Sequence, residues 1–332
     1  MSRAAIWLLS AGVLLFIGVL VSQGLPAVLS TLALAGWGLL AVALFHLLPL
    51  WLDAEAIRVL FDRHAPRAAH AALLARWAGE SATSLTPGGQ IGGPVLMARH
   101  LALQGMPMPA AAAAITVSTT LQTLAQILFA LLGMALLGAQ ATQMPNSAVR
   151  TALLIAAGVL AITVVPFYLV QRRGLFGGVM RLAARFAVNR DWSALVSQAA
   201  AIDEAIERTY LRRGQAAASF ALSLIGWLVG TGEVYLILHL LHAPVSVRVA
   251  LLLESLGQAI RGAAFAIPGS LGVQEGGYLL LAPLAGLAPQ TALALSLAKR
   301  ARELLLGLPG LLYLHHAERS RRAGAADDVT IK

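Results

Sequence analysis

Residues 109–137 read PAAAAAITVSTTLQTLAQILFALLGMALL, and this stretch of 29 residues contains no Asp, Glu, Lys or Arg. A helix of about 20 predominantly apolar residues is long enough to cross the hydrocarbon core of a bilayer. The stretch therefore predicts a membrane-spanning helix. A polar patch lies near its middle, made of Ser118, Thr119, Thr120, Gln122, Thr123 and Gln126.

Four further apolar runs predict crossings, and a fifth lies within Tyr278–Leu314. The four runs are Ala4–Val21, Leu29–Leu52, Thr151–Val170 and Ala216–Leu241, the last with a Gly226-x-x-x-Gly230 motif that permits close helix packing. Hydrophobic residues make up 58% of the 332 positions and charged residues 12%, whereas soluble domains are nearer half apolar and a quarter charged. We therefore expect an all-α polytopic membrane protein with about six full crossings.

Composition excludes several classes of protein. The chain has no cysteine, which excludes disulfides, thiol catalysis and cysteine-bound metals. Its net charge is +9, but the arginines lie between apolar runs, as in cytoplasmic loops, so we predict no nucleic-acid partner. The histidines are scattered and no phosphate-binding loop is present, so neither a metal site nor a cofactor is expected.

Positive charge also predicts the orientation. The segment 171–215 carries eight arginines and four acids, and its residues 175–187 and 195–210 each have the pattern of an amphipathic helix. The positive-inside rule places this loop, Arg3 and a short tail at 316–332 in the cytoplasm. We therefore expect one transmembrane domain over residues 1–315 in a bacterial-type inner membrane, with both termini inside.

Two remaining stretches, Arg67–Gln104 and Pro244–Leu287, fit this orientation if each is re-entrant, entering and leaving the membrane on one side. They share an order of motifs. The first half has His64-Ala65-Pro66, Glu80-Ser81, Pro87-Gly88 and Gly105, and the second has His242-Ala243-Pro244, Glu254-Ser255, Pro268-Gly269 and Gly286. This order predicts a duplication with units at about 53–139 and 242–315. Three crossings separate the units, which inverts the second, as in transporters whose substrate site lies at the midplane between repeats.

Each stretch contains a sequence that breaks a helix. Residues 86–94 read TPGGQIGGP and residues 268–277 read PGSLGVQEGG. Proline removes a backbone donor and glycine loosens the backbone, so we expect both segments to be non-helical. The residues responsible are Pro87, Gly88, Gly92, Gly93, Pro268, Gly269, Gly272, Gly276 and Gly277. Such backbone lies at membrane depth only inside protein or beside a wet cavity; surface loops are the alternative.

Ionisable side chains within apolar segments are costly and indicate function by default. Glu254, Gln258 and Arg261 share one helical face, where the two charges either neutralise each other or face a substrate. Glu275, in the second break, suits a helix cap, a proton donor or a site for a cationic group.

Lys299, Arg300, Arg302 and Glu303 interrupt the last apolar region. They lie near mid-membrane if one helix covers residues 289–314, and at the cytoplasmic surface if residues 278–297 form the crossing. An offset of 181 residues aligns them with the polar patch of 109–137. We therefore favour a buried basic site for an anionic headgroup, with Glu233 as its candidate counter-charge.

Several of these residues carry a family resemblance. Gly79-Glu80-Ser81, Pro87-Gly88 and Gly92 through Arg99 resemble the first signature of the flippase-like membrane family that includes the transmembrane region of lysylphosphatidylglycerol synthases. Pro268-Gly269-x-x-Gly272-Val273-Gln274-Glu275 resembles its second signature. The stretch 254–310, with Gln258-x-x-Arg261-Gly262 and Lys299-Arg300-Ala301-Arg302, resembles the branch associated with hopanoid biosynthesis. Pro94 stands where the family pattern leads us to expect an acid.

The resemblance, which covers residues 4 to about 314, implies a lipid flippase with a membrane lipid, such as a hopanoid, as cargo and lipid-biosynthesis proteins as further partners. The candidate translocation residues are Glu80, Gln90, Arg99, Glu254, Gln258, Arg261, Glu275, Lys299, Arg300, Arg302 and Glu303. Two alternatives remain: a non-catalytic scaffold for lipid biosynthesis, and an intramembrane lipid-modifying enzyme. A transporter requires these charges to line a cavity between the repeats, whereas an enzyme requires them to converge on a reacting atom.

Overall fold

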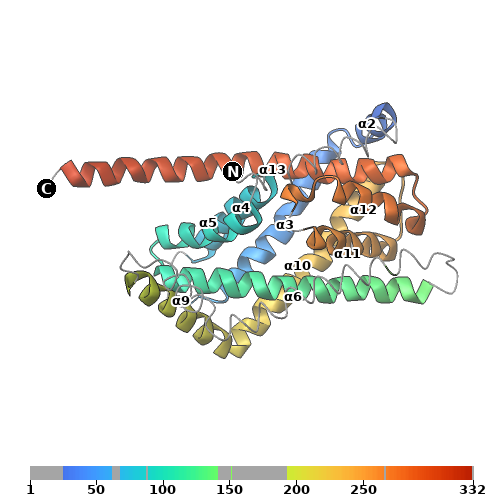
Figure 1. Ribbon diagram of the computed structural model, residues 1–332. Coiled ribbons are helices and arrows are strands. Elements are labelled where there is room, and N and C mark those ends of the chain that lie inside the picture. The colour runs from blue at the N-terminus through green and yellow to red at the C-terminus, as the bar shows by residue number, and fades with distance from the viewer. Residues whose placement is uncertain are drawn as a thin grey trace.

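The computed structural model describes residues 25–61, 68–86, 89–140, 151, 193–264 and 267–330, and every regular element in these ranges is helical (Figure 1). The elements are α2 (Leu25–Ala33), α3 (Gly38–Arg58), α4 (Ala68–Leu85), α5 (Gly89–Leu103), α6 (Met108–Gln140), α9 (Ser193–Leu211), α10 (Arg213–Leu240), α11 (Val247–Ala263), η2 (Pro268–Ser270), α12 (Val273–Leu281), η3 (Ala282–Ala285) and α13 (Pro289–Thr330). The predicted crossing Ala4–Val21, most of Thr151–Val170 and the amphipathic stretch 175–187 lie outside the described residues.

Within the described residues, three helices, α3, α6 and α10, are long and apolar enough to cross a membrane. The predicted bounds of α6 and α10 are confirmed to within four residues. The run Leu29–Leu52 was predicted wrongly as one helix, because the chain turns after Ala33 and α3 continues to Arg58. The turn contains Gly36, whose φ of 44° is one that glycine adopts without steric cost.

The two odd stretches form helical hairpins, α4 with α5 and α11 with α12. The predicted breaks are too long. Gly92 and Gly93 lie inside α5, and Gly276 and Gly277 lie inside α12. Gly93 serves close packing instead, because a Cβ there would meet Thr83 Oγ1 of α4 at 2.1 Å. The second break is the turn before Val273, which contains Gly269 and Gly272 with φ values of 60° and 76°.

A common turn joins each hairpin to the long helix that follows it. In the first half, Gly105 has φ of 96° and the Met106 N–H donates to Leu101 O at 3.3 Å. In the second half, Gly286 has φ of 65° and the Leu287 N–H donates to Ala282 O at 3.0 Å. These are Schellman-type helix ends. Both turns, and the starts of α6 and α13, are related by the same 181-residue offset that aligned the sequence motifs.

The offset also relates α3 to α10, so the corresponding order is α3-α4-α5-α6 and α10-α11-α12-α13. Each four-helix set begins earlier than the units 53–139 and 242–315 expected from the motifs. Corresponding helices run in opposite directions: α6 runs against α13, and α3 runs against α10, beside which it packs (Figure 1).

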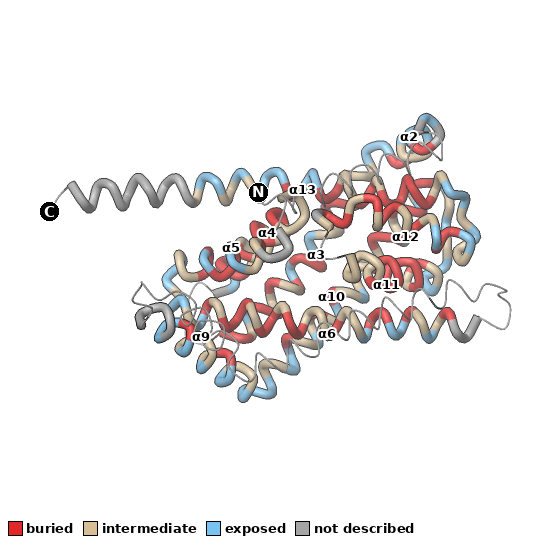
Figure 2. The backbone as a smooth tube through the Cα atoms, in the orientation of Figure 1, coloured by how far each residue is buried: buried red, intermediate tan, exposed pale blue. Residues whose placement is uncertain are grey.

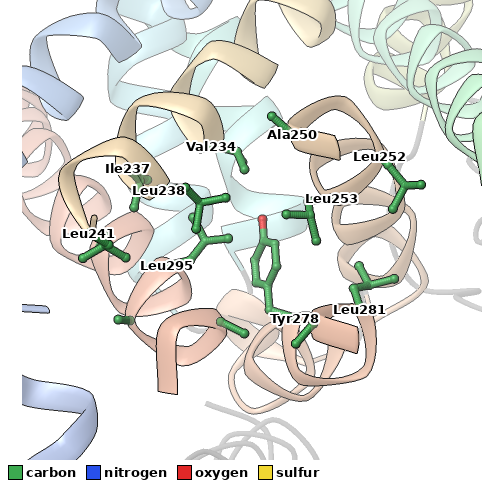
Figure 3. Packing of buried hydrophobic residues seen from close by; sticks show 14 of the residues in the cluster. Val234, Ile237, Leu238, Leu241, Ala250, Leu252, Leu253, Tyr278, Leu281 and Leu295 are labelled. Carbon is green, nitrogen blue, oxygen red and sulfur yellow. The ribbon is translucent and has the colours of Figure 1, made fainter. Parts of the chain in front are cut away.

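Apolar side chains gather at two ends of the bundle. One cluster joins the end of α3 to α4, α5 and the start of α6, and contains Ile57, Leu101 and Ile115. The other joins α10 to α11, α12 and α13 around Tyr278, which lies among Leu238, Leu253 and Leu295 (Figure 3). Figure 2 shows many of the buried residues in these same two regions. The middle of the bundle, between the clusters, contains the polar residues described below.

The outer surface carries many large apolar side chains. Examples, each between 47% and 59% exposed, are Leu44 and Trp51 on α3, Leu131 on α6 and Leu308 on α13. Apolar residues outside and charged residues inside are the reverse of a soluble protein, and suit a bundle surrounded by lipid.

The amphipathic stretch 195–210 is confirmed as part of α9. Its apolar side, with Ala199 and Ile206 buried, packs against the first-half cluster, while Glu204 and Glu207 are exposed.

Candidate functional site

A cavity of about 390 Å³ lies in the middle of the bundle, lined by α3, α4, α5, α6, α10, α11 and α13. The three long apolar helices contribute residues from their central turns. These are His46, Pro49, Leu50 and Asp53 on α3, Thr119, Gln122, Thr123 and Gln126 on α6, and Gly226, Trp227, Gly230 and Glu233 on α10. The cavity is therefore level with the central turns of α3, α6 and α10, the helices of the described part of the chain that are able to span the membrane.

Glycine brings α10 close to its neighbours at this depth. A Cβ on Gly226 would lie 3.3 Å from Asp53 Oδ1 of α3, and one on Gly230 would lie 3.9 Å from Glu254 Oε1 of α11. Of the motif Gly226-x-x-x-Gly230, only Gly226 therefore lies in a tight contact, whereas the Cβ position of Gly230 is at an ordinary van der Waals distance. Both glycines line the cavity.

Two ion pairs tie α11 to α13 on one side of the cavity. Lys299 Nζ lies 2.7 Å from Glu254 Oε2, and Arg261 NH1 lies 2.7 Å from Glu303 Oε1. The alternative in which Glu254 and Arg261 neutralise each other is wrong, because each reaches a partner on the neighbouring helix. Gln258 Nε2 donates to Glu254 Oε1 at 2.9 Å, so the predicted stripe acts as one polar surface.

A third group of polar residues joins α3, α4 and α6. Arg76 NH2 donates to Asp53 Oδ2 at 2.7 Å, and Gln122 Nε2 donates to the same oxygen at 2.6 Å. Glu80, one turn after Arg76, has Oε2 3.4 Å from Arg76 NH2. This group brings the polar patch of α6, and Glu80, into the site.

His46 connects the two sides. Its Nδ1 lies 2.7 Å from Glu233 Oε2, and its Nε2 lies 2.9 Å from Glu80 Oε1 and 2.9 Å from Arg302 NH1. Glu233 Oε1 in turn lies 3.3 Å from Arg302 Nε and 3.7 Å from Lys299 Nζ. The expectation that Glu233 supplies a counter-charge to these two cations is confirmed.

The expected excess of positive charge is absent from the described lining. Four cationic side chains, Arg76, Arg261, Lys299 and Arg302, face five carboxylates, Asp53, Glu80, Glu233, Glu254 and Glu303. The prediction of a basic site was wrong because three of these acids lie on helices remote in sequence from the Lys299–Glu303 cluster. They are Asp53 on α3, Glu80 on α4 and Glu233 on α10. Burying an unpaired charge is far more costly than burying a pair, which explains why the fold supplies the acids.

Glu275 and Arg300 lie beside the cavity lining and hold the second break. The Gly272 N–H donates to Glu275 Oε2 at 2.8 Å, which caps the start of α12. Arg300 NH1 donates to Gly269 O at 2.6 Å, and Arg300 NH2 donates to Ser270 O at 3.3 Å. Arg300 Nε also donates to Glu275 Oε1 at 3.2 Å, so these two residues form one support for the turn.

The other predicted candidates are placed differently. Arg99 is exposed on α5 and does not line the cavity. Gln90 lies in the first turn of α5, and its side chain is outside the described part of the structure, as are Pro87 and Gly88.

Three ionisable residues of the described lining were not predicted: His46, Asp53 and Arg76. His46 lies inside an apolar run, a position that by itself indicates function in a membrane helix. The position of His46 within an apolar run is visible in the sequence, although a metal-ligand pattern does not include it.

Comparison with known families agrees with this arrangement. The model of the family described as the lysylphosphatidylglycerol synthase transmembrane region matches residues 6–310. The chain belongs to this family. No curated protein and no solved structure matches the chain. Membership confirms the predicted resemblance and, together with the apolar helices, a membrane protein related to lipid handling.

Within the described residues, most charged groups already contact an opposite charge, and these partners come from both four-helix sets.

Proposed function

We propose that this protein moves a membrane lipid between the leaflets, with the lipid headgroup passing through the cavity and the acyl or polycyclic tail remaining in lipid. The observation that carries the proposal is the charged cavity at the middle of the apolar bundle. A headgroup in hydrocarbon loses its water, and fixed ion pairs replace part of that hydration.

The balance of charge supports a zwitterionic headgroup, one with both a phosphate and an amine. Arg261 and Arg302 offer planar donors that match phosphate oxygens, while Glu80 and Glu233 accept from an ammonium group. The volume of about 390 Å³ is within the range of small-molecule sites and suits a headgroup without its tails.

The opposed halves support transport by alternating access. We take the four-helix sets as inverted repeats, with hairpins α4–α5 and α11–α12 as re-entrant segments and about six crossings in all. In this arrangement rocking of one half against the other opens the cavity to each side in turn.

The resemblance of residues 254–310 to the hopanoid-associated branch makes an extended hopanoid with a polar end a second cargo to test. The inner membrane, with both termini in the cytoplasm, remains the proposed location on the strength of the arginine-rich loop and tail.

The decisive variant is Gly230→Leu, which narrows the cavity. A Cβ at Gly230 meets nothing closer than Glu254 Oε1 at 3.9 Å, and Gly230 lines the cavity, so the larger side chain should occupy cavity space. The purified protein would be placed in liposomes that contain phosphatidylethanolamine labelled on an acyl chain, and leaflet exchange would be followed by dithionite quenching. We expect exchange well above empty liposomes for the wild type and at least a ten-fold loss for Gly230→Leu.

Gly214→Leu is the matched control, because Gly214 lies exposed at the start of the same helix with open space around its Cβ position. It should exchange lipid like the wild type. Background exchange of zwitterionic, anionic and hopanoid probes by a folded wild-type protein would refute the proposal. A chemically altered lipid recovered from the vesicles would favour the enzyme alternative, and unaltered lipid with no exchange the scaffold.

A further inference from the structure

His46 has neighbours that require opposite protonation states of one nitrogen. Nε2 is 2.9 Å from Glu80 Oε1, which only accepts hydrogen bonds when ionised, and 2.9 Å from Arg302 NH1, which only donates them. A protonated Nε2 bonds to Glu80 and opposes Arg302. An unprotonated Nε2 accepts from Arg302 and repels Glu80.

The other ring nitrogen does not compete. Nδ1 is 2.7 Å from Glu233 Oε2 and donates to it in both states, so Glu233 holds the ring while Nε2 changes partner. A glutamate at this second nitrogen also fixes the tautomer of the neutral ring, with its proton on Nδ1.

The surrounding groups give no alternative partner for Nε2 among the described residues. α10 presents Glu233; α4 presents Glu80 and, beyond it, Arg76; α13 presents Arg302, with Lys299 across Glu233. On its own helix the charged residue nearest to His46 is Asp53, which is bound to Arg76. α2 and α6, which also lie near α3 or the cavity, contain no charged residue.

The two competing partners lie on different halves of the protein. Glu80 is on the hairpin helix of the first set, and Arg302 is on the long helix of the second. We propose that proton binding at His46 Nε2 changes its hydrogen-bond partner from Arg302 on α13 to Glu80 on α4, and that this switch couples lipid exchange to proton movement. The proton comes from and returns to water in the cavity, into which both His46 and Glu80 are partly exposed.

The coupling deepens the proposed transport function, but its structural part is tested without a measurement of lipid exchange. Because the chain has no cysteine, Ala69→Cys on α4 and Leu312→Cys on α13, both exposed, form a unique pair for spin labels. The distance between labels would be measured by pulsed electron spin resonance in lipid nanodiscs from pH 5.5 to 8.5. We expect a shift that follows a single titration, and no shift after His46→Gln, because glutamine gains no proton.

His239→Gln is the control, since His239 is exposed on α10 and should leave the titration unchanged. A distance that is independent of pH, or one that shifts equally in His46→Gln, would overturn the switch.

The transport part uses the same liposomes with a pH gradient imposed and labelled lipid extracted by albumin. The wild type should accumulate labelled lipid in one leaflet at steady state, and His46→Gln should equilibrate it evenly. Even distribution by an actively exchanging wild type would refute the coupling and leave the proposed flippase function intact. Background exchange at every pH would refute the flippase function, while the label distances would still decide the switch.

Discussion

Lys299, the one lysine in the described cavity lining, has 2% of its side-chain surface exposed. Its ammonium group has a carboxylate at 2.7 Å on α11 and a second at 3.7 Å on α10. Attraction between buried charges offsets the loss of hydration only while both partners are present. The pair of Lys299 with Glu254 therefore contributes little net stability to the fold. Each of the two residues nevertheless depends on the other, because removing one leaves the other buried without its partner.

A double-mutant cycle tests this dependence. Lys299→Met should lower the free energy of unfolding by about 3–5 kcal/mol, since it leaves Glu254 buried without its nearest cation. Adding Glu254→Gln should recover most of that loss. Unfolding would be followed by circular dichroism in mixed micelles.

The control is Arg58→Ala, which removes the half-exposed pair with Glu55 and should cost less than about 1 kcal/mol. Equal losses for Lys299→Met and the double variant would contradict the mutual dependence.

At this scale the sequence predicts which residues matter better than what they contact. A glutamate or lysine within an apolar run is visible in the chain, and Glu254, Lys299 and Arg302 were predicted for that reason. Glu233 was also predicted, as their counter-charge, but the contacts of His46 were not, because His46 is separated from Glu233 by 187 residues and from Arg302 by 256. Such pairings follow from tertiary packing, and the local pattern contains no information on them.

At the scale of elements, the two hairpins are held differently. The second break is held by Arg300, which donates to Gly269 O and Ser270 O and contacts Glu275. The 181-residue offset places Thr119 opposite Arg300 and Pro94 opposite Glu275, so the first half lacks both members of this support. The support that holds the second break therefore has no counterpart at the aligned positions of the first half.

The variant Arg300→Ala tests whether Arg300 supports the second break. We expect faster amide hydrogen exchange in residues 267–273 and a loss of about 2–3 kcal/mol in local stability, because two carbonyls and a buried carboxylate lose a charged donor. Mass spectrometry of peptic fragments from the protein in nanodiscs measures both.

Arg248→Ala, at an exposed position of α11, is the matched variant and should leave these amides unchanged. Unchanged exchange in residues 267–273 after Arg300→Ala would show that the turn does not depend on the arginine.

Helix type and length were predictable where composition alone determines them. The bounds of α6 and α10 followed from apolar runs. The breaks were predicted too long because glycine has two uses: Gly269 takes a left-handed backbone, whereas Gly93 and Gly277 lie in helices that approach a neighbour closely. A glycine in the sequence is compatible with either use, and only the tertiary packing of the neighbouring helix shows which one applies.

For the whole molecule, inversion of the halves makes a topological prediction. If the halves are inverted, the turn before α6 and the turn before α13 lie on opposite sides of the membrane. In an otherwise cysteine-free chain, Ala288→Cys should react with a membrane-impermeant maleimide in spheroplasts, and Gln104→Cys only after permeabilisation.

Both positions are exposed in the bundle, so protection of Gln104→Cys would reflect the membrane and not burial. Gly214→Cys, beside the arginine-rich loop, should behave like Gln104→Cys. Labelling of Gln104→Cys and Ala288→Cys from the same side would contradict the inverted arrangement.

The balance of charge in the cavity also determines how the membrane voltage acts on the protein. With His46 protonated, five positive and five negative groups line the described part of the cavity, so turning the site from one side to the other carries no net charge. With His46 neutral, the same movement carries one negative charge, worth about 2.3 kcal/mol per 100 mV across the full membrane. If the proposed transport takes place, the voltage acts on movements of the site with His46 neutral and leaves movements with His46 protonated unaffected.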